Sequence, residues 1–122
     1  MKNTPEFKIQ TEQFDDIRIL RYQVPGFETL PLNDKIAIYY LAQAALWGRD
    51  ILWNQNYKHN LQIRKTLENV IQTYSGNKQT KAFEGFMRYA KKVFFSNGIH
   101  HHYSMDKFYP SIAEEDMAQI FD

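Results

Sequence analysis

A chain of 122 residues allows one domain at most, and its 16% aromatic content supplies a modest apolar core and argues against disorder. Its 15 Lys and Arg against 14 Asp and Glu leave a net charge of +1, which excludes the strongly basic balance typical of nucleic-acid binding. It has no cysteine, which excludes disulfides, thiol catalysis and thiolate metal sites.

The N-terminal part of the sequence predicts one strand. Residues 1–12 are expected to form a flexible lead-in, and their polar start interrupted by Pro5 is not typical of a signal peptide. The segment Ile17–Val24 is rich in β-branched and aromatic residues and ends at Pro25-Gly26, a turn signal, which predicts a strand. No second convincing strand follows, so we expect this one to pair outside the chain or with a second copy. Asp15-Asp16 predicts a solvated turn or a helix start.

The first predicted helix follows Pro31. Asn33 can cap it, its apolar residues recur at helical spacing, and Gly48 is expected to kink or end it. The recurring positions are Ile36, Tyr40, Ala44, Trp47 and Ile51. Four aromatic residues of this region could form a binding platform, although their helical spacing favours the core. They are Tyr39, Tyr40, Trp47 and Trp53.

Two further helices are predicted from apolar periodicity. One covers about 57–74 and is closed by Gly76 in a left-handed conformation. The other covers about 80–96 and is closed by Asn97-Gly98. Their inward-facing residues are Ile63, Leu67, Val70, Ile71 and Tyr74 in the first, and Phe83, Phe86, Met87, Ala90, Val93 and Phe94 in the second.

A short final helix is predicted to begin at Ser111, directly after Pro110. Ser111 and Glu114 match the capping box Ser-x-x-Glu, and the acidic run 114–116 suits the positive end of a helix dipole. Its apolar stripe is Ile112, Met117, Ile120 and Phe121. We therefore expect a mainly α fold over residues 13–122, with three longer helices, a short C-terminal helix and one N-terminal strand.

The densest polar cluster is Ser96–Lys107, which contains the consecutive residues His100, His101 and His102. Neighbouring residues of extended chain point to opposite faces, so only His100 and His102 could share a metal ion. Zinc would need at least one more ligand from elsewhere. The alternatives are a loop whose imidazoles hydrogen-bond to the backbone, and a loop that presents donors to a ligand in a cleft.

No motif of a self-sufficient enzyme is present. The sequence has no Ser-His-Asp spacing, no phosphate-binding glycine loop and no His-Glu-x-x-His pattern, and His59 is isolated. The amide-rich run Trp53–Tyr57 could cap helices or contact a ligand. Any chemistry must therefore be completed by residues outside the chain.

Four runs of sequence carry a family resemblance: Ile17–Glu28, Ile38–Asp50, Arg64–Glu68 and Phe95–Pro110. They resemble the N-terminal region of the dipeptidyl peptidase III family, and its bacterial, Bacteroides-like branch most. The last run reads Phe-Ser-Asn-Gly-Ile-His-His-His-Tyr-Ser-Met-Asp-Lys-Phe-Tyr-Pro. The eukaryotic branch has a related Ser-Asn-x-Gly-Asn-Tyr run followed by Asp-x-Lys-Phe.

The resemblance implies a zinc-dependent exopeptidase that removes dipeptides from the N-termini of short peptides, in a cleft between two lobes. The family binds zinc through a His-Glu-x-x-Gly-His helix and a later Glu, and the motif's Glu activates water. This chain lacks that motif, so it contains no assignable catalytic, cofactor or metal residue. It is expected to be part of the first lobe and inactive alone, with Ile17–Val24 in the β core of that lobe. The expected cleft-wall residues are Asn97, Gly98, His100, His102, Tyr103, Asp106 and Lys107.

The implied partners are the remainder of the peptidase chain and, in the complete enzyme, a peptide substrate. A rival interpretation is a stand-alone helical interaction module that self-associates through its edge strand and exposed aromatics. A third is a small zinc-binding protein that uses His100 and His102. No apolar run approaches the roughly 20 residues of a membrane span, and we expect a cytoplasmic location without nucleic-acid or membrane partners.

Overall fold

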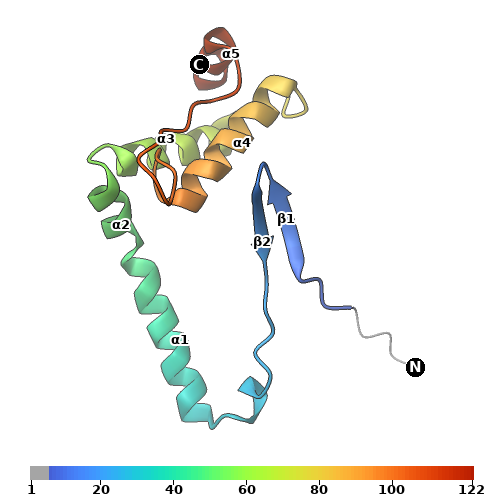
Figure 1. The fold of residues 1–122 in the computed structure, drawn as a ribbon, viewed down its shortest axis with the longest axis vertical. Coiled ribbons are helices and arrows are strands. Elements are labelled where there is room, and N and C mark those ends of the chain that lie inside the picture. The colour runs from blue at the N-terminus through green and yellow to red at the C-terminus, as the bar shows by residue number, and fades with distance from the viewer. Residues whose placement is uncertain (1–5) are drawn as a thin grey trace. The chain divides into compact units, whose positions relative to one another are not determined.

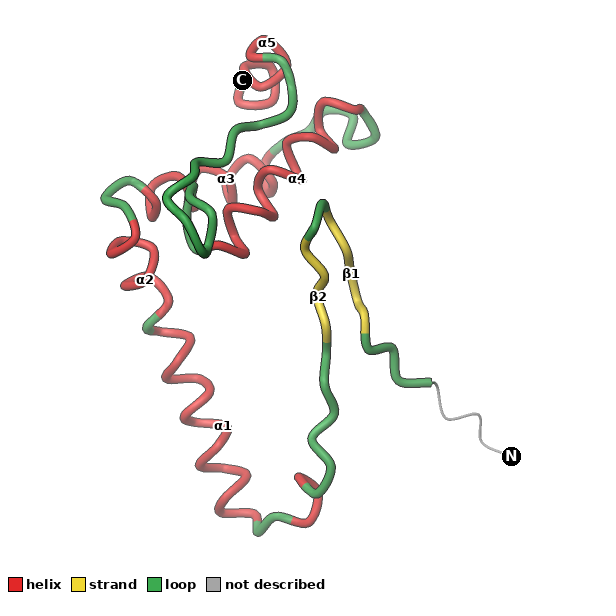
Figure 2. Tube along the Cα trace, viewed as in Figure 1, coloured by secondary structure: helices red, strands yellow, loops and turns green. Residues whose placement is uncertain are grey.

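The computed structural model describes residues 6–122 and shows a mainly helical chain with one small antiparallel sheet (Figure 1 and Figure 2). The predicted fold class is therefore confirmed. The chain divides into two compact units, with the boundary between Ala44 and Ala45. Across residues 6–122, no helix is both long enough and apolar enough to span a membrane.

The sheet is a hairpin of β1 (Gln10–Phe14) and β2 (Ile17–Leu20), paired antiparallel across Asp15-Asp16. Asp15 adopts a left-handed conformation with φ 55°. Aspartate tolerates this region because its short polar side chain can hydrogen-bond locally. The predicted solvated turn at Asp15-Asp16 is confirmed.

Three predictions about this strand region are wrong. The strand has a partner within the chain, β1, which the sequence did not reveal, and residues 10–12 of the expected lead-in belong to β1. The sequence of β1, Gln-Thr-Glu-Gln-Phe, lacks the apolar alternation that reveals a half-buried strand, and all but its last residue are exposed. β2 also ends at Leu20, four residues before Val24. Residues 1–5 of the expected lead-in lie outside the described part of the chain.

The first predicted helix is divided at Gly48 into α1 (Leu32–Trp47) and α2 (Arg49–Asn56), which confirms the break at this glycine. Because α1 begins at Leu32, Asn33 lies inside its first turn and does not cap it. The apolar side chains of α1 surround the helix instead of forming one stripe, and none of its residues is buried. The core prediction therefore holds for Trp53, which is 3% exposed, and is wrong for the aromatic residues of α1. Those exposed residues are Tyr39, Tyr40 and Trp47.

The second unit has one apolar core, built by α2, α3 (Asn60–Thr73), α4 (Lys81–Ser96) and α5 (Glu114–Phe121). Phe86 and Val93 of α4 are completely buried. The buried members are Trp53, Leu67, Val70, Phe83, Phe86, Ala90, Val93 and Ile120. The inward faces predicted for α3 and α4 are confirmed, because every predicted residue is buried in this core or packs against it.

The end of α3 differs from the prediction. The helix stops before Tyr74, and Gly76 does not have a positive φ. The Tyr74 ring instead folds back beneath Gly76, where an added Cβ would collide with it, and stacks on Phe83 with centroids 4.8 Å apart. Glycine is therefore needed here for close approach and not for a left-handed cap.

The start of α5 also differs. The helix begins at Glu114 after Ala113, without a side-chain cap, so the predicted box of Ser111 and Glu114 does not form. Ile112 instead lies against Gly85 of α4, where an added Cβ would collide with it. This tertiary contact occupies the segment that would otherwise form the first turn of the helix.

Candidate functional site

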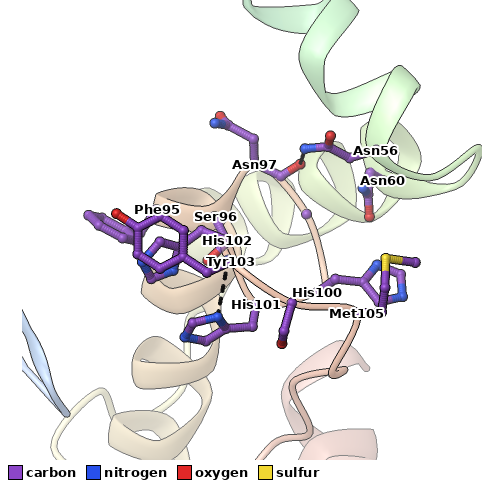
Figure 3. Close-up of a pocket in the computed structure, with 12 residues that line it drawn as sticks. Asn56, Asn60, Phe95, Ser96, Asn97, His100, His101, His102, Tyr103 and Met105 are labelled. Carbon is purple, nitrogen blue, oxygen red and sulfur yellow. Dashed lines mark hydrogen bonds between the residues drawn. The ribbon is translucent and has the colours of Figure 1, made fainter.

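A cavity of about 520 Å³ lies in the second unit, between the C-terminal end of α4 and the junction of α2 with α3 (Figure 3). Its volume falls within the range of small-molecule sites. The lining is polar and aromatic, and it contains no Lys, Arg, Asp or Glu. The lining residues are Asn56, Asn60, Phe95, Ser96, Asn97, Gly98, His100, His101, His102, Tyr103, Ser104 and Met105.

The end of α4 shapes one side of the cavity. Asn97 has φ 52° and Gly98 has φ 155°, and the N–H groups of both donate to the carbonyl oxygen of Val93. A Cβ at Gly98 would collide with the carboxamide of Asn60. Glycine is required here by both the backbone conformation and the approach of α3, and the predicted closure at Asn97-Gly98 is confirmed.

Asn60 joins α3 to the loop after α4. Its side chain is completely buried, and Oδ1 accepts a hydrogen bond from the Ile99 N–H at 3.2 Å. Neither Asn60 Nδ2 nor Ser96 Oγ has a hydrogen-bond partner within residues 6–122. Asn56 Nδ2 donates to the carbonyl oxygen of Asn97 at 3.4 Å (Figure 3). The two asparagines thus hold the loop beside the α2–α3 junction.

Arg64 holds α2 against α3 and so positions Asn56. Its guanidinium donates to Asp50 Oδ1 at 2.6 Å and to Glu68 Oε1 at 2.8 Å, and lies 5.5 Å from the ring centroid of Trp53. The hydrogen bond to Glu68 is the largest cause that raises the pKa of Arg64. The arginine therefore remains a cation and bridges the two helices.

The loop after α4 folds into a short antiparallel pair. His100 lies opposite Lys107, the His101 N–H donates to the carbonyl oxygen of Asp106, and the Phe108 N–H donates to that of Ile99, both at 2.8 Å. At the tip, Ser104 Oγ donates to Asp106 Oδ2 at 2.8 Å. These hydrogen bonds give a defined conformation to a segment that has no regular secondary structure.

The His101 imidazole is hydrogen-bonded to the backbone of its own loop. Its Nδ1 accepts a hydrogen bond from the Tyr103 N–H at 3.1 Å. It stacks on His102 with centroids 4.4 Å apart. His101 therefore serves the loop as a backbone-bonded structural residue, one of the roles predicted for the cluster.

His102 lies among aromatic rings at the mouth of the cavity. Its centroid is 5.1 Å from that of Phe95 and 4.2 Å from that of Tyr103. Tyr103 is 88% exposed and Met105 is 82% exposed, so both present apolar surface to solvent beside the cavity. On the other side, His100 meets the edge of Tyr57 at 5.7 Å.

The predicted cleft residues divide into two groups. Those on the cavity wall are Asn97, Gly98, His100, His102 and Tyr103. Asp106 and Lys107 do not line the cavity, because Asp106 bonds to Ser104 and Lys107 lies across the pair from His100. Sequence reasoning missed Asn60, whose polar side chain gives no sign of its burial. Asn56 was signalled only by the amide-rich run before Tyr57.

The described residues do not form a metal site. Among residues 6–122, no group of three or more His, Cys, Asp or Glu side chains is placed to hold an ion. His100 and His59 both pack against Tyr57, and His102 packs against Phe95.

The cavity lining offers amides, hydroxyls and imidazoles as hydrogen-bond donors and acceptors, with aromatic side chains beside them. When the chain is compared with known proteins, no family model matches it, and no curated protein matches it either.

Proposed function

We propose that the chain is an N-terminal part of a dipeptidyl peptidase III-like zinc exopeptidase, which releases dipeptides from the N-termini of peptides. In this proposal the cavity forms part of the cleft wall, the partners are the rest of the enzyme and its peptide substrate, and the location is cytoplasmic. The chain is inactive alone, because the zinc ligands and the catalytic Glu belong to other sequence.

One observation supports the proposal most. The longest family-like run is Phe95–Pro110, and every residue of the cavity lining except Asn56 and Asn60 comes from that run. A segment that is conspicuous in sequence thus supplies most of the lining of a cavity in the second unit. Loops positioned by a rigid scaffold are where binding residues concentrate, and α3 and α4 provide such a scaffold.

The test has two arms. The purified chain with added zinc is expected to release no arylamine from a dipeptidyl-arylamide, whereas activity that a chelator abolishes would overturn the proposal. The coding DNA after Asp122 is expected to continue in frame to a His-Glu-x-x-Gly-His motif. A reading frame that ends without this motif would also overturn the proposal.

A second candidate is a helical module that associates with itself, and α1 is the feature that favours it. The twelve residues Ile36–Trp47 carry no charge, and Tyr40 and Trp47 are 66% and 88% exposed. Association would use these aromatics and the edge of β2 that does not face β1. Light scattering over a range of concentrations tests it: a concentration-dependent dimer, lost in Trp47→Ala but kept in Tyr109→Ala, would favour this candidate.

A further inference from the structure

The antiparallel pair after α4 leaves one residue with its backbone groups turned outward. In such a pair, residues that do not bond directly across the ladder point their N–H and C=O groups away from the partner. Here the bonds are made by Ile99 and His101, and His100 is the residue between them. The backbone N–H and C=O of His100 form no hydrogen bond with another part of residues 6–122.

His100 lines the cavity, whereas its partner Lys107 does not (Figure 3). A free donor and a free acceptor on one residue form the smallest unit of a strand edge, and extended peptides add to such edges through main-chain hydrogen bonds.

The remaining lining suits a peptide main chain better than a charged ligand. Carboxamides, hydroxyls and imidazoles offer both donors and acceptors, as an amide backbone requires, and no Lys or Arg is present to neutralise a phosphate. The loop tip adds Tyr103 and Met105, whose exposed apolar surface can cover a large side chain.

We propose that this cavity binds a short extended peptide, whose main chain pairs with the N–H and C=O of His100 and whose large apolar or aromatic side chain lies against Tyr103 and Met105. This inference rests on the proposed function, because it names the residues through which the same cleft wall would bind a peptide. It concerns binding alone and includes no bond-breaking step.

A pair of substitutions separates the backbone of His100 from its imidazole. His100→Ala removes the ring and keeps the N–H, whereas His100→Pro also removes the outward N–H, which the ladder does not use. The probe is acetyl-Ala-Ala-Phe-Ala-amide, titrated into the ¹⁵N-labelled full chain and followed by NMR shifts of residues 97–105. We expect the proline variant to bind roughly fivefold more weakly than the alanine variant, as one lost hydrogen bond predicts. Equal affinities in two folded variants would overturn the proposal.

A set of N-methylated probes gives the same answer without altering the protein. Each probe carries one N-methyl group, and at least one position is expected to weaken binding roughly fivefold by removing a main-chain donor. Uniform affinity across the set would overturn main-chain pairing even if His100→Pro does not fold.

The side-chain contact has a matched control. Tyr103→Ala is expected to weaken binding of the Phe-containing probe more than that of the all-Ala probe. Tyr109→Ala, which removes a ring of similar exposure (78% against 88%) outside the cavity, is expected to change neither. Equal effects of the two variants, or saturable binding of a neutral oligosaccharide in place of the peptides, would overturn the proposal.

The outcomes also separate this inference from the proposed function. Peptides that fail to bind, together with a downstream zinc motif, would refute the role of His100 and leave the peptidase proposal standing. Peptide binding without such a motif would support the role of His100 as a peptide edge and refute the peptidase assignment.

Discussion

Replacing Gly98 by alanine should destabilise the second unit. The added Cβ meets the carboxamide of Asn60, and the backbone at Gly98 has φ 155°, a conformation that favours glycine. Asn60 is completely buried and cannot swing into solvent. The methyl group must therefore displace the side chain that binds the Ile99 N–H.

Two costs add in this variant. A positive φ at a residue with a Cβ costs about 1–2 kcal/mol. Loss of the Asn60 acceptor leaves the part-buried Ile99 N–H unpaired, which costs about 1–3 kcal/mol. The expected fall in the free energy of unfolding is therefore about 2–5 kcal/mol, which lowers Tm by at least about 8 °C for a unit of this size.

Trp53 reports this change because it is 3% exposed in the core of the second unit, whereas Trp47 is already 88% exposed. Urea unfolding followed by tryptophan fluorescence gives the free energy of unfolding. Gly48→Ala is the control within the second unit: Gly48 has φ −77°, and an added Cβ lies 3.6 Å from the Ala45 carbonyl oxygen, an ordinary van der Waals contact. That variant should show neither cost.

A double-mutant cycle decides whether the contact itself is responsible. In an Asn60→Ala background the collision is removed, so Gly98→Ala should cost only its backbone strain. The coupling energy between the two positions should then exceed about 1 kcal/mol. Additive effects within about 0.5 kcal/mol would refute the contact between Gly98 and Asn60.

Three further predictions concern the core, the α2–α3 bridge and the loop. Phe86→Ala should lower the free energy of unfolding, measured with urea, by about 3–5 kcal/mol. Phe121 packs against the Phe86 ring but is 44% exposed, so Phe121→Ala should lower it by less than half as much. Equal losses in the two variants would contradict this packing. Arg64→Ala should lower the free energy of unfolding by about 1 kcal/mol, because it removes the hydrogen bonds to Asp50 and Glu68. Lys65→Ala, at an exposed neighbouring position, should leave it nearly unchanged. A comparable loss in both variants would count against the role of Arg64 as a bridge between α2 and α3. His101→Ala should remove the acceptor of the Tyr103 N–H. Amide exchange of Tyr103 relative to its intrinsic rate should then increase, and an unchanged protection factor would contradict this hydrogen bond.

The helices of the second unit were predictable because their apolar residues recur with the helical period. The faces of α3 and α4 and the closure at Asn97-Gly98 depend on neighbours within a few positions. Local steric rules and side-chain hydrogen bonds operate at that range, so one sequence is enough to read them. The loop Phe95–Pro110 was also recognisable as the candidate site, because its polar and aromatic residues are concentrated in one run.

Other features depend on contacts between distant residues, which one sequence does not display. Strand β1 is polar and becomes a strand because β2 supplies its hydrogen-bond partners. Ile112 lies against Gly85, which delays the start of α5, and the Tyr74 ring occupies the space beside Gly76. Asn60 reads as an ordinary polar residue until the fold buries it beneath Gly98. The sequence by itself determined the helical class and the run that forms the cavity. Only the tertiary structure decided which side chains close the cavity and that His100 presents its backbone, because both follow from packing across long separations in the chain.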